Sequence, residues 1–168
     1  MFQNVWMLLG GIAIIVALLS LLVAPKRKGA ALPAGPWPYY ARRPITQAEQ
    51  ILYWRLLEAL PNHIVLAQVQ YSRFLGVKKG NNFRSWLNRV NRLSADFVVC
   101  AKDAKVVAVI ELDDASHEKA ERKRSDESKN RALAGAQIPL IRYRPGAMPD
   151  LAQIKKDVMA NITIEADT

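Results

Sequence analysis

The chain has 168 residues, which is enough for one domain and an appendage, and it carries a formal net charge of +9. Residues 1–44 contain five basic residues and no acid, so the remainder holds 19 basic and 15 acidic residues, a net charge of +4. This mild surplus argues against a histone-like binder. One cysteine, Cys100, and two histidines exclude an internal disulfide and an ordinary zinc site.

The N-terminal segment reads as a membrane anchor. Residues 1–24 carry no charged side chain, and residues 5–23 are almost continuously apolar. As a helix, residues 5–23 span about 28 Å, close to the thickness of a bilayer's hydrocarbon core. A cleaved signal peptide is the rival interpretation, but the start is not basic and the apolar run is long. Lys26, Arg27 and Lys28 follow, so the positive-inside rule predicts a single span with the C-terminal domain in the cytoplasm.

Residues 25–44 are predicted to be a basic, proline-rich linker. Four prolines and two glycines fall between residues 29 and 44, a composition typical of a semi-rigid tether. Residues 45–168 then form the folded domain. In chain order it is expected to contain a helix from Thr46 to Pro61, a strand over 64–71, a short amphipathic helix over 82–92, strands over 95–100 and from 106, a helix over 118–136, a strand over 138–143 and a helix over 151–159.

Two of these strands bring carboxylates together. The polar break at residues 102–105 predicts a hairpin in which Asp96 lies opposite Glu111. Asp113 shares the face of Glu111 because side chains alternate along a strand. Three carboxylates this close disfavour joint ionisation, and oxygen ligands with open positions suit Mg²⁺ or Mn²⁺. The alternative is a charged loop that only leaves the sheet.

The segment before this hairpin is basic. It contains six basic residues and no acid, and its apolar residues fall at helical spacing: Arg73, Lys78, Lys79, Arg84, Arg89 and Arg92 are the basic ones. Such a face can contact a phosphate backbone without reading sequence. The alternative is a face that is only solvated.

The combined pattern resembles a known group of nucleases. Asp96-Phe97 on one strand is followed by Glu111-Leu112-Asp113-Asp114-Ala115-Ser116-His117 on the next, and then by Asp126 and Lys129 on a helix. This string is similar to that of the very-short-patch-repair endonucleases and their uncharacterised bacterial relatives, within the PD-(D/E)XK restriction-endonuclease-like superfamily. The likeness covers about residues 45–145. It identifies the chain as a member of a bacterial family of unknown function, with the anchor in the bacterial inner membrane.

The resemblance implies an α/β fold with an αβββαβ core, in which helices flank a mixed sheet. It also implies metal-binding roles for Asp96 and Glu111, and contributions from Glu49 on the first helix and Gln68 on the first strand. From the residues alone, Glu49 is most simply the capping-box partner of Thr46. Asp113 stands where the superfamily has a catalytic lysine, so either His117 or Lys129 takes that part or the domain no longer cuts. His117 could also simply cap the next helix.

Two hypotheses of function follow. In the first, the domain is a Mg²⁺- or Mn²⁺-dependent nuclease acting on nucleic acid, with DNA as the expected form, and His117 accepts a proton from the attacking water. In the second, it is a non-catalytic module that binds nucleic acid or a protein at the membrane. The carboxylate cluster favours the nuclease, because a binder has no need of three acids facing DNA.

Overall fold

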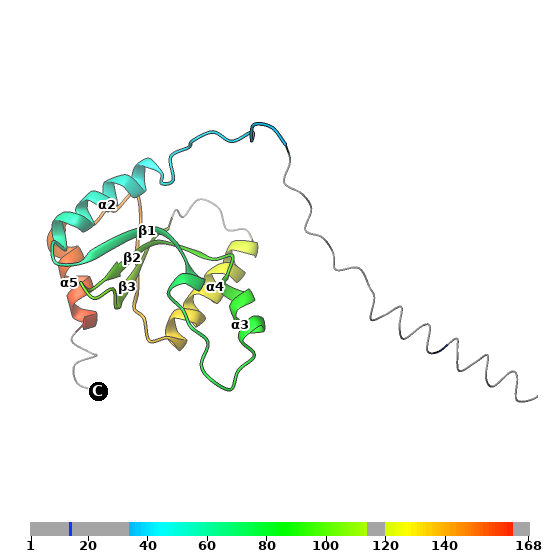
Figure 1. Cartoon of the computed structure of the whole chain (residues 1–168). Helices are drawn as coiled ribbons and strands as arrows, with labels where there is room; N and C mark the ends of the chain where they lie inside the picture. Colours follow the sequence, from blue (N-terminus) through cyan, green and yellow to red (C-terminus); the bar gives the residue numbers. More distant parts are fainter. Residues whose placement is uncertain (1–13, 15–33, 114–119, 163–168) are drawn as a thin grey trace, which may run out of the picture. The chain divides into compact units, whose positions relative to one another are not determined.

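The computed structural model describes residue 14, residues 34–113 and residues 120–162 (Figure 1). The chain divides into two compact units, Met1–Ala41 and Arg42–Thr168, and every element discussed below belongs to the second. Apart from Ile14, the expected anchor over residues 5–23 lies outside the described residues. None of the helices that the structure describes combines the length and apolarity needed to cross a bilayer.

A four-stranded mixed sheet forms the centre of the domain. Its strands are β1 (Ile64–Gln70), β2 (Ser94–Cys100), β3 (Val106–Leu112) and β4 (Leu140–Tyr143), which lie in that order across the sheet. The first two pairings are antiparallel and β3 pairs with β4 in parallel, so the prediction of a mixed sheet is confirmed. Phe97 pairs with Ile110 and Val98 with Val109, which is the register that the hairpin argument requires.

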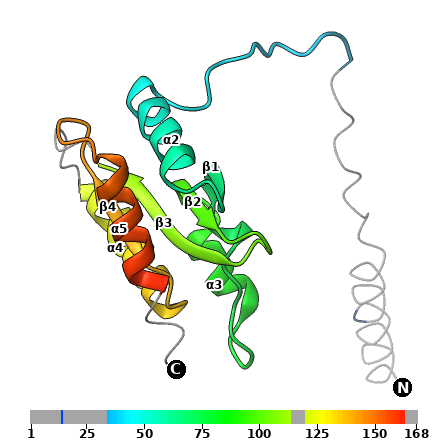
Figure 2. The same cartoon turned by 90° about the vertical axis from the view of Figure 1, so that its left-hand side faces the viewer.

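Helices cover both faces of this sheet (Figures 1 and 2). α2 (Gln47–Ala59) and α5 (Leu151–Ile162) lie on one face, and their apolar residues pack with those of the strands: Leu52, Leu56, Phe97, Ile110, Ile154 and Val158. α4 (Ala120–Gly135) lies on the other face, where Leu133 joins Tyr71, Val98 and Val109. Burying a side chain of this size contributes about 1.5–3 kcal/mol, so the two clusters hold the three layers together.

The segment between β1 and β2 extends beside α4. It begins with a short 3-10 helix, η1 (Tyr71–Arg73), and ends with α3 (Phe83–Val90), whose N-cap Asn82 accepts a hydrogen bond from the Ser85 amide. The predicted amphipathic helix is therefore present. Its apolar face is only partly used, because Leu87 and Val90 are half-buried whereas Phe83 and Trp86 are exposed.

The predicted capping box is confirmed, because Thr46 caps α2 and both halves of its box with Glu49 are present. The backbone of β1 is irregular at Gln68, whose φ of 53° lies in the left-handed region that side chains rarely adopt. Gln68 falls between the pairs Ala67–Phe97 and Val69–Ala95, at the position that corresponds to Asp96 on β2.

Candidate active site

Glu111 is the buried charge around which the candidate site is built. Only 3% of the residue is exposed, at the end of β3 on the face that α4 covers. Lys129 of α4 donates from Nζ to Glu111 Oε2 at 2.7 Å, and the Tyr71 hydroxyl donates to Oε1 at 3.3 Å. Burial raises the pKa of Glu111 and nearby Asp96 raises it further, whereas the bond and charge of Lys129 oppose the rise. Both carboxylate oxygens are thus engaged within the protein.

Asp96 lies beside Glu111 on the neighbouring strand. It is half-buried, and its Oδ2 accepts a hydrogen bond from the Leu112 amide at 2.8 Å, across the end of the hairpin. Burial raises the pKa of Asp96, the Leu112 bond and the Lys129 charge lower it, and the charges of Glu49 and Asp113 raise it. The Lys129 charge therefore lowers the pKa of both acids that the hairpin argument brings together, Asp96 and Glu111.

Asp113 is held by a different partner. Its Oδ2 lies 2.5 Å from Nη1 of Arg142 on β4, and Arg142 Nη2 donates to Asn130 Oδ1 of α4 at 3.1 Å. Partial burial would lower the pKa of Arg142, but the bond and charge of Asp113 outweigh it and the pKa is raised. Arg142 of β4 therefore connects Asp113, which follows β3, to Asn130 of α4.

The donors at this site fit a hard divalent cation. Among the described residues, no three or more His, Cys, Asp or Glu side chains gather in a way that could hold a metal ion. Asp96 and Glu111 nevertheless suit Mg²⁺, which usually keeps several waters and binds through one or two carboxylates plus substrate phosphates. A metal site made of Asp96, Glu111 and Asp113 stays a prediction, and the Asp113 carboxylate would have to be shared with Arg142.

Glu49 and Gln68 connect the first helix to the edge of this site. Glu49 Oε2 accepts from the Thr46 amide at 2.5 Å, and Glu49 Oε1 accepts from Gln68 Nε2 at 2.8 Å. Glu49 is therefore the capping partner of Thr46 and a contact of Gln68 at the same time. The left-handed backbone of Gln68 is a strained conformation, of the kind that persists mainly where surrounding structure supports it.

The remaining predicted residues have mixed outcomes. Lys129 is brought directly to the site, whereas Asp114 and His117 lie outside the described residues. The six basic residues between β1 and β2 are all exposed, and none has an acid within ion-pair distance in the part of the chain that the structure describes: Arg73, Lys78, Lys79, Arg84, Arg89 and Arg92. Their contact with nucleic acid stays a prediction.

Sequence reasoning missed Tyr71 as a partner of Glu111. Tyr71 is fully buried, and a buried tyrosine hydroxyl normally finds a hydrogen-bond partner. Its position at the end of an apolar strand was therefore a usable signal. The link from Arg142 through Asn130 offered no such signal, since it depends on how α4 lies against β4.

Comparison with known proteins adds a family. The family model described as "Protein of unknown function (DUF2726)" matches residues 42–162. No curated protein and no solved structure matches the chain. A family of unknown function agrees with the expectation from the sequence, and these comparisons provide no link to the very-short-patch-repair nucleases.

The Glu111–Lys129 pair predicts a large and pH-dependent stability effect. Lys129→Met leaves a buried carboxylate without its cation and should lower the free energy of unfolding at neutral pH by about 3–5 kcal/mol. The double variant Glu111→Gln/Lys129→Met should recover most of this loss. Burial raises the pKa of Glu111, so in Lys129→Met this carboxyl takes up a proton as pH falls. The stability of Lys129→Met should therefore be retained below pH 4.5, the ordinary pKa of a glutamate, and lost as pH rises through the raised pKa of Glu111.

Urea unfolding of the full-length chain, from below pH 4.5 to neutral pH, measures both the loss of stability in Lys129→Met and its dependence on pH. Arg131→Met is the matched control, because Arg131 pairs with Glu127 on the exposed side of the same helix, with side chains 80% and 59% exposed. It should cost less than about 1 kcal/mol at any pH. Equal losses in Lys129→Met and Arg131→Met at neutral pH would contradict the assigned burial of the pair.

Proposed function

The chain belongs to the DUF2726 family of proteins of unknown function, and from its site we propose that it is a membrane-tethered, divalent-metal-dependent nuclease. It hydrolyses phosphodiester bonds, with DNA as the expected substrate. The observation that carries the proposal is the 2.7 Å contact between Lys129 of α4 and the buried Glu111, beside Asp96. Acids on two adjacent strands and a lysine at the second acid are the chemical parts that such a nuclease needs.

The topology supports the same proposal. Apart from η1 and α3, which lie between β1 and β2, the order α2, β1, β2, β3, α4, β4 is the αβββαβ order on which the resemblance to restriction-endonuclease-like enzymes rests. The sheet is mixed in the expected way, and Asp96 and Glu111 fall on its two central strands. A restriction-endonuclease-like core is therefore the fold that we propose for residues 45–168.

Lys129 brings an ammonium group to the site although the superfamily's catalytic lysine is missing from β3. Asp113 stands where the superfamily's lysine would follow the glutamate, and Asp113 binds Arg142 instead. Lys129 reaches the Glu111 carboxylate from a different element, so an ammonium group is present at the site even without that lysine. It can donate to a phosphoryl oxygen or orient the attacking water.

In this proposal Asp96 and Glu111 hold one Mg²⁺ or Mn²⁺, with Asp113 as a further candidate ligand. Such an ion, when bound, stabilises negative charge on the phosphoryl oxygens and makes a water more acidic. Glu49 and Gln68 support the edge of the site through their mutual hydrogen bond. His117, which lies outside the described residues, is suited as a neutral imidazole to take the proton from the water while the phosphorus–oxygen bond to the leaving sugar breaks.

Metal binding and cleavage should separate the roles of these residues. Asp96→Asn and Glu111→Gln should each abolish the heat of Mn²⁺ binding in calorimetry and the cleavage of plasmid, single-stranded DNA and RNA. His117→Ala should keep the heat of binding but lower turnover by about 10²–10⁴-fold, the usual loss for a general base. Glu58→Gln, an exposed carboxylate on α2, is the control and should change neither readout. No heat and no cleavage in the unmutated chain would end the enzyme proposal.

In this proposal the exposed basic segment between β1 and β2 binds the phosphates of the substrate. Each arginine that neutralises a phosphate releases counterions, so binding should weaken steeply as salt rises. Reversing the charge at Arg84, Arg89 and Arg92 together should weaken binding and reduce the slope of log affinity against log salt by about one per lost contact. The control reverses Lys102, Lys155 and Lys156, which are exposed elsewhere on the domain and change the net charge equally. Equal binding by the two triple variants would show that the basic face is only solvated.

The tether is proposed from the sequence. Residues 1–24 have no charged side chain and Lys26, Arg27 and Lys28 follow directly, which favours a span with the domain in the cytoplasm. A cytoplasm-dependent reporter fused to the C-terminus should therefore be active, and the chain should remain in the membrane fraction. Activity of a periplasm-dependent reporter instead, or a mature chain that begins near Ala24, would contradict this topology.

A non-catalytic binding module is the second candidate. The observation that favours it is that both oxygens of Glu111 are already satisfied by Tyr71 and Lys129, so the carboxylate is stable without a metal. In that case the basic segment still binds nucleic acid, but Mn²⁺ gives no heat and no substrate is cut. The calorimetric and cleavage measurements above therefore decide between the two.

A further inference from the structure

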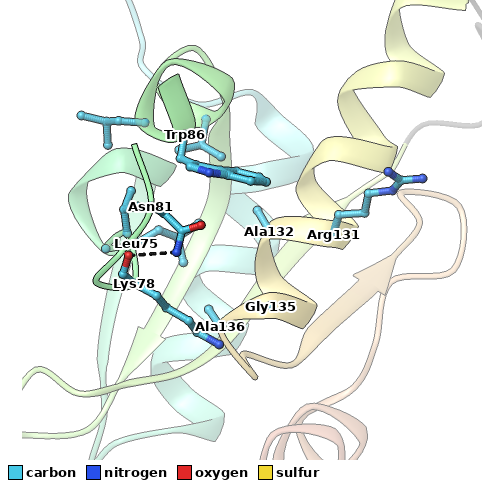
Figure 3. A pocket seen from close by; sticks show the side chains of 12 residues that line it. Leu75, Lys78, Asn81, Trp86, Arg131, Ala132, Gly135 and Ala136 are labelled. Atoms are coloured by element: carbon cyan, nitrogen blue, oxygen red, sulfur yellow. Dashed lines mark hydrogen bonds between the residues drawn. The ribbon is translucent and has the colours of Figure 1, made fainter. Parts of the chain in front are cut away.

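A pocket outside the carboxylate site lies between α4 and the segment that joins β1 to β2 (Figure 3). Its volume is about 330 Å³, near the lower end of the range for small-molecule sites. Leu75, Leu87 and Val90 contribute apolar side chains to it. Ala132 and Gly135 line it from α4, together with Ala136 directly after the helix. The size and the mostly apolar lining suit a flat, ring-sized ligand rather than a large cofactor.

Trp86 gives this pocket an aromatic wall. In Figure 3 its ring extends from α3 toward Ala132 of α4, and the residue is 49% exposed. The Arg89 guanidinium, which does not line the pocket, lies 4.7 Å from the centre of the indole ring and supports it in place. An indole that is both supported and exposed is a platform on which another ring can stack.

The charges around the pocket are positive. Its charged lining residues are Lys78 and Arg131, and no acid lines it. In Figure 3 the Lys78 side chain extends toward Ala136, whereas Arg131 points away from Trp86. Arg131 pairs with Glu127 of the same helix. Lys79, Arg84 and Arg89 are exposed on the same segment. A ring attached to an anionic backbone matches this combination of an apolar pocket and a basic rim.

The pocket and the carboxylate site share two elements. Lys129 and Ala132 are three residues apart on α4, so they lie on one side of the helix about 4.5 Å apart along its axis. Tyr71, which donates to Glu111, is followed closely by Leu75 in the pocket wall, and the Leu75 amide donates to the Tyr71 carbonyl at 3.0 Å. The pocket wall on α4 therefore begins about one helical turn from Lys129, the residue that donates to Glu111.

We propose that this pocket binds one unpaired nucleobase, stacked on Trp86, and positions a neighbouring phosphodiester at Asp96, Glu111 and Lys129. The proposal rests on the nuclease function and narrows its substrate to nucleic acid with an unpaired base. Base stacking on an aromatic side chain tolerates any sequence because every base has a π-face. Lys78 then contacts the phosphate next to the bound base.

The test measures binding of the full-length chain, without metal, to three fluorescent duplexes of one sequence. One carries a single extra unpaired thymidine, one has an abasic residue at that point, and one is fully paired. The unpaired thymidine should tighten binding by about 5–150-fold over the abasic duplex, the range expected for stacking of one base. Trp86→Ala should abolish this preference and Trp86→Phe should retain part of it.

A variant whose larger side chain fills the pocket tests the proposal independently of Trp86. Gly135→Leu should remove the preference, because nothing lies within 4 Å of a Cβ built at Gly135 and the added side chain can occupy the pocket without disturbing the fold. Ala134→Leu is the matched control, since Ala134 is exposed on α4 and does not line the pocket, and it should keep the preference.

The outcomes separate this proposal from the nuclease function. Equal binding of the three duplexes by the unmutated chain, or a preference that survives both Trp86→Ala and Gly135→Leu, overturns the pocket proposal and leaves cleavage to be judged by Asp96→Asn. A preference that depends on Trp86 and Gly135, in a chain that cuts nothing with Mn²⁺, supports the pocket and overturns the nuclease. No binding to any duplex overturns the pocket proposal.

Discussion

The burial of one carboxylate, that of Glu111, is the constraint on which the rest of the domain depends. A buried ionised acid is costly unless it is paired and hydrogen-bonded, and Glu111 meets this condition with Lys129 on one oxygen and Tyr71 on the other. Lys129 comes from α4 and Tyr71 from η1. The two hydrogen bonds to Glu111, near the end of β3, therefore fix how α4 and the β1–β2 segment lie against the sheet.

A second polar link strengthens the same layer. Arg142 of β4 binds Asp113 at the end of β3 and Asn130 on α4, one position after Lys129. The apolar contacts of Leu133 with Val98 and Val109 hold α4 on the sheet, but such contacts do not specify the rotation of the helix. The two polar links do, because hydrogen bonds have direction and Lys129 and Asn130 must both face the strands.

The hairpin and the site differ in how well they could be predicted. A short polar break between two apolar runs leaves little choice of register, so the pairing of Phe97 with Ile110, and with it the approach of Asp96 to the end of β3, followed from the sequence. The Lys129 contact could only be named as a possibility, since its direction depends on the packing of α4. The left-handed Gln68 and the exposed Trp86 depart from simple periodicity. Gln68 bonds Glu49 and Trp86 contacts the Arg89 guanidinium, and periodicity encodes neither contact.

The charges of the described residues suggest an order of events for the proposed chemistry. Glu49, Asp96, Glu111 and Asp113 bring four negative charges, and Lys129 and Arg142 bring two positive ones, so the group carries a formal charge of −2. A phosphodiester alone is repelled by that surplus, whereas one divalent cation neutralises it. The cation would also compete with Lys129 for Glu111. An ammonium group released from that contact would be free to donate to a phosphate oxygen, so Lys129 would stabilise Glu111 without a metal and contact the proposed substrate once the metal is bound.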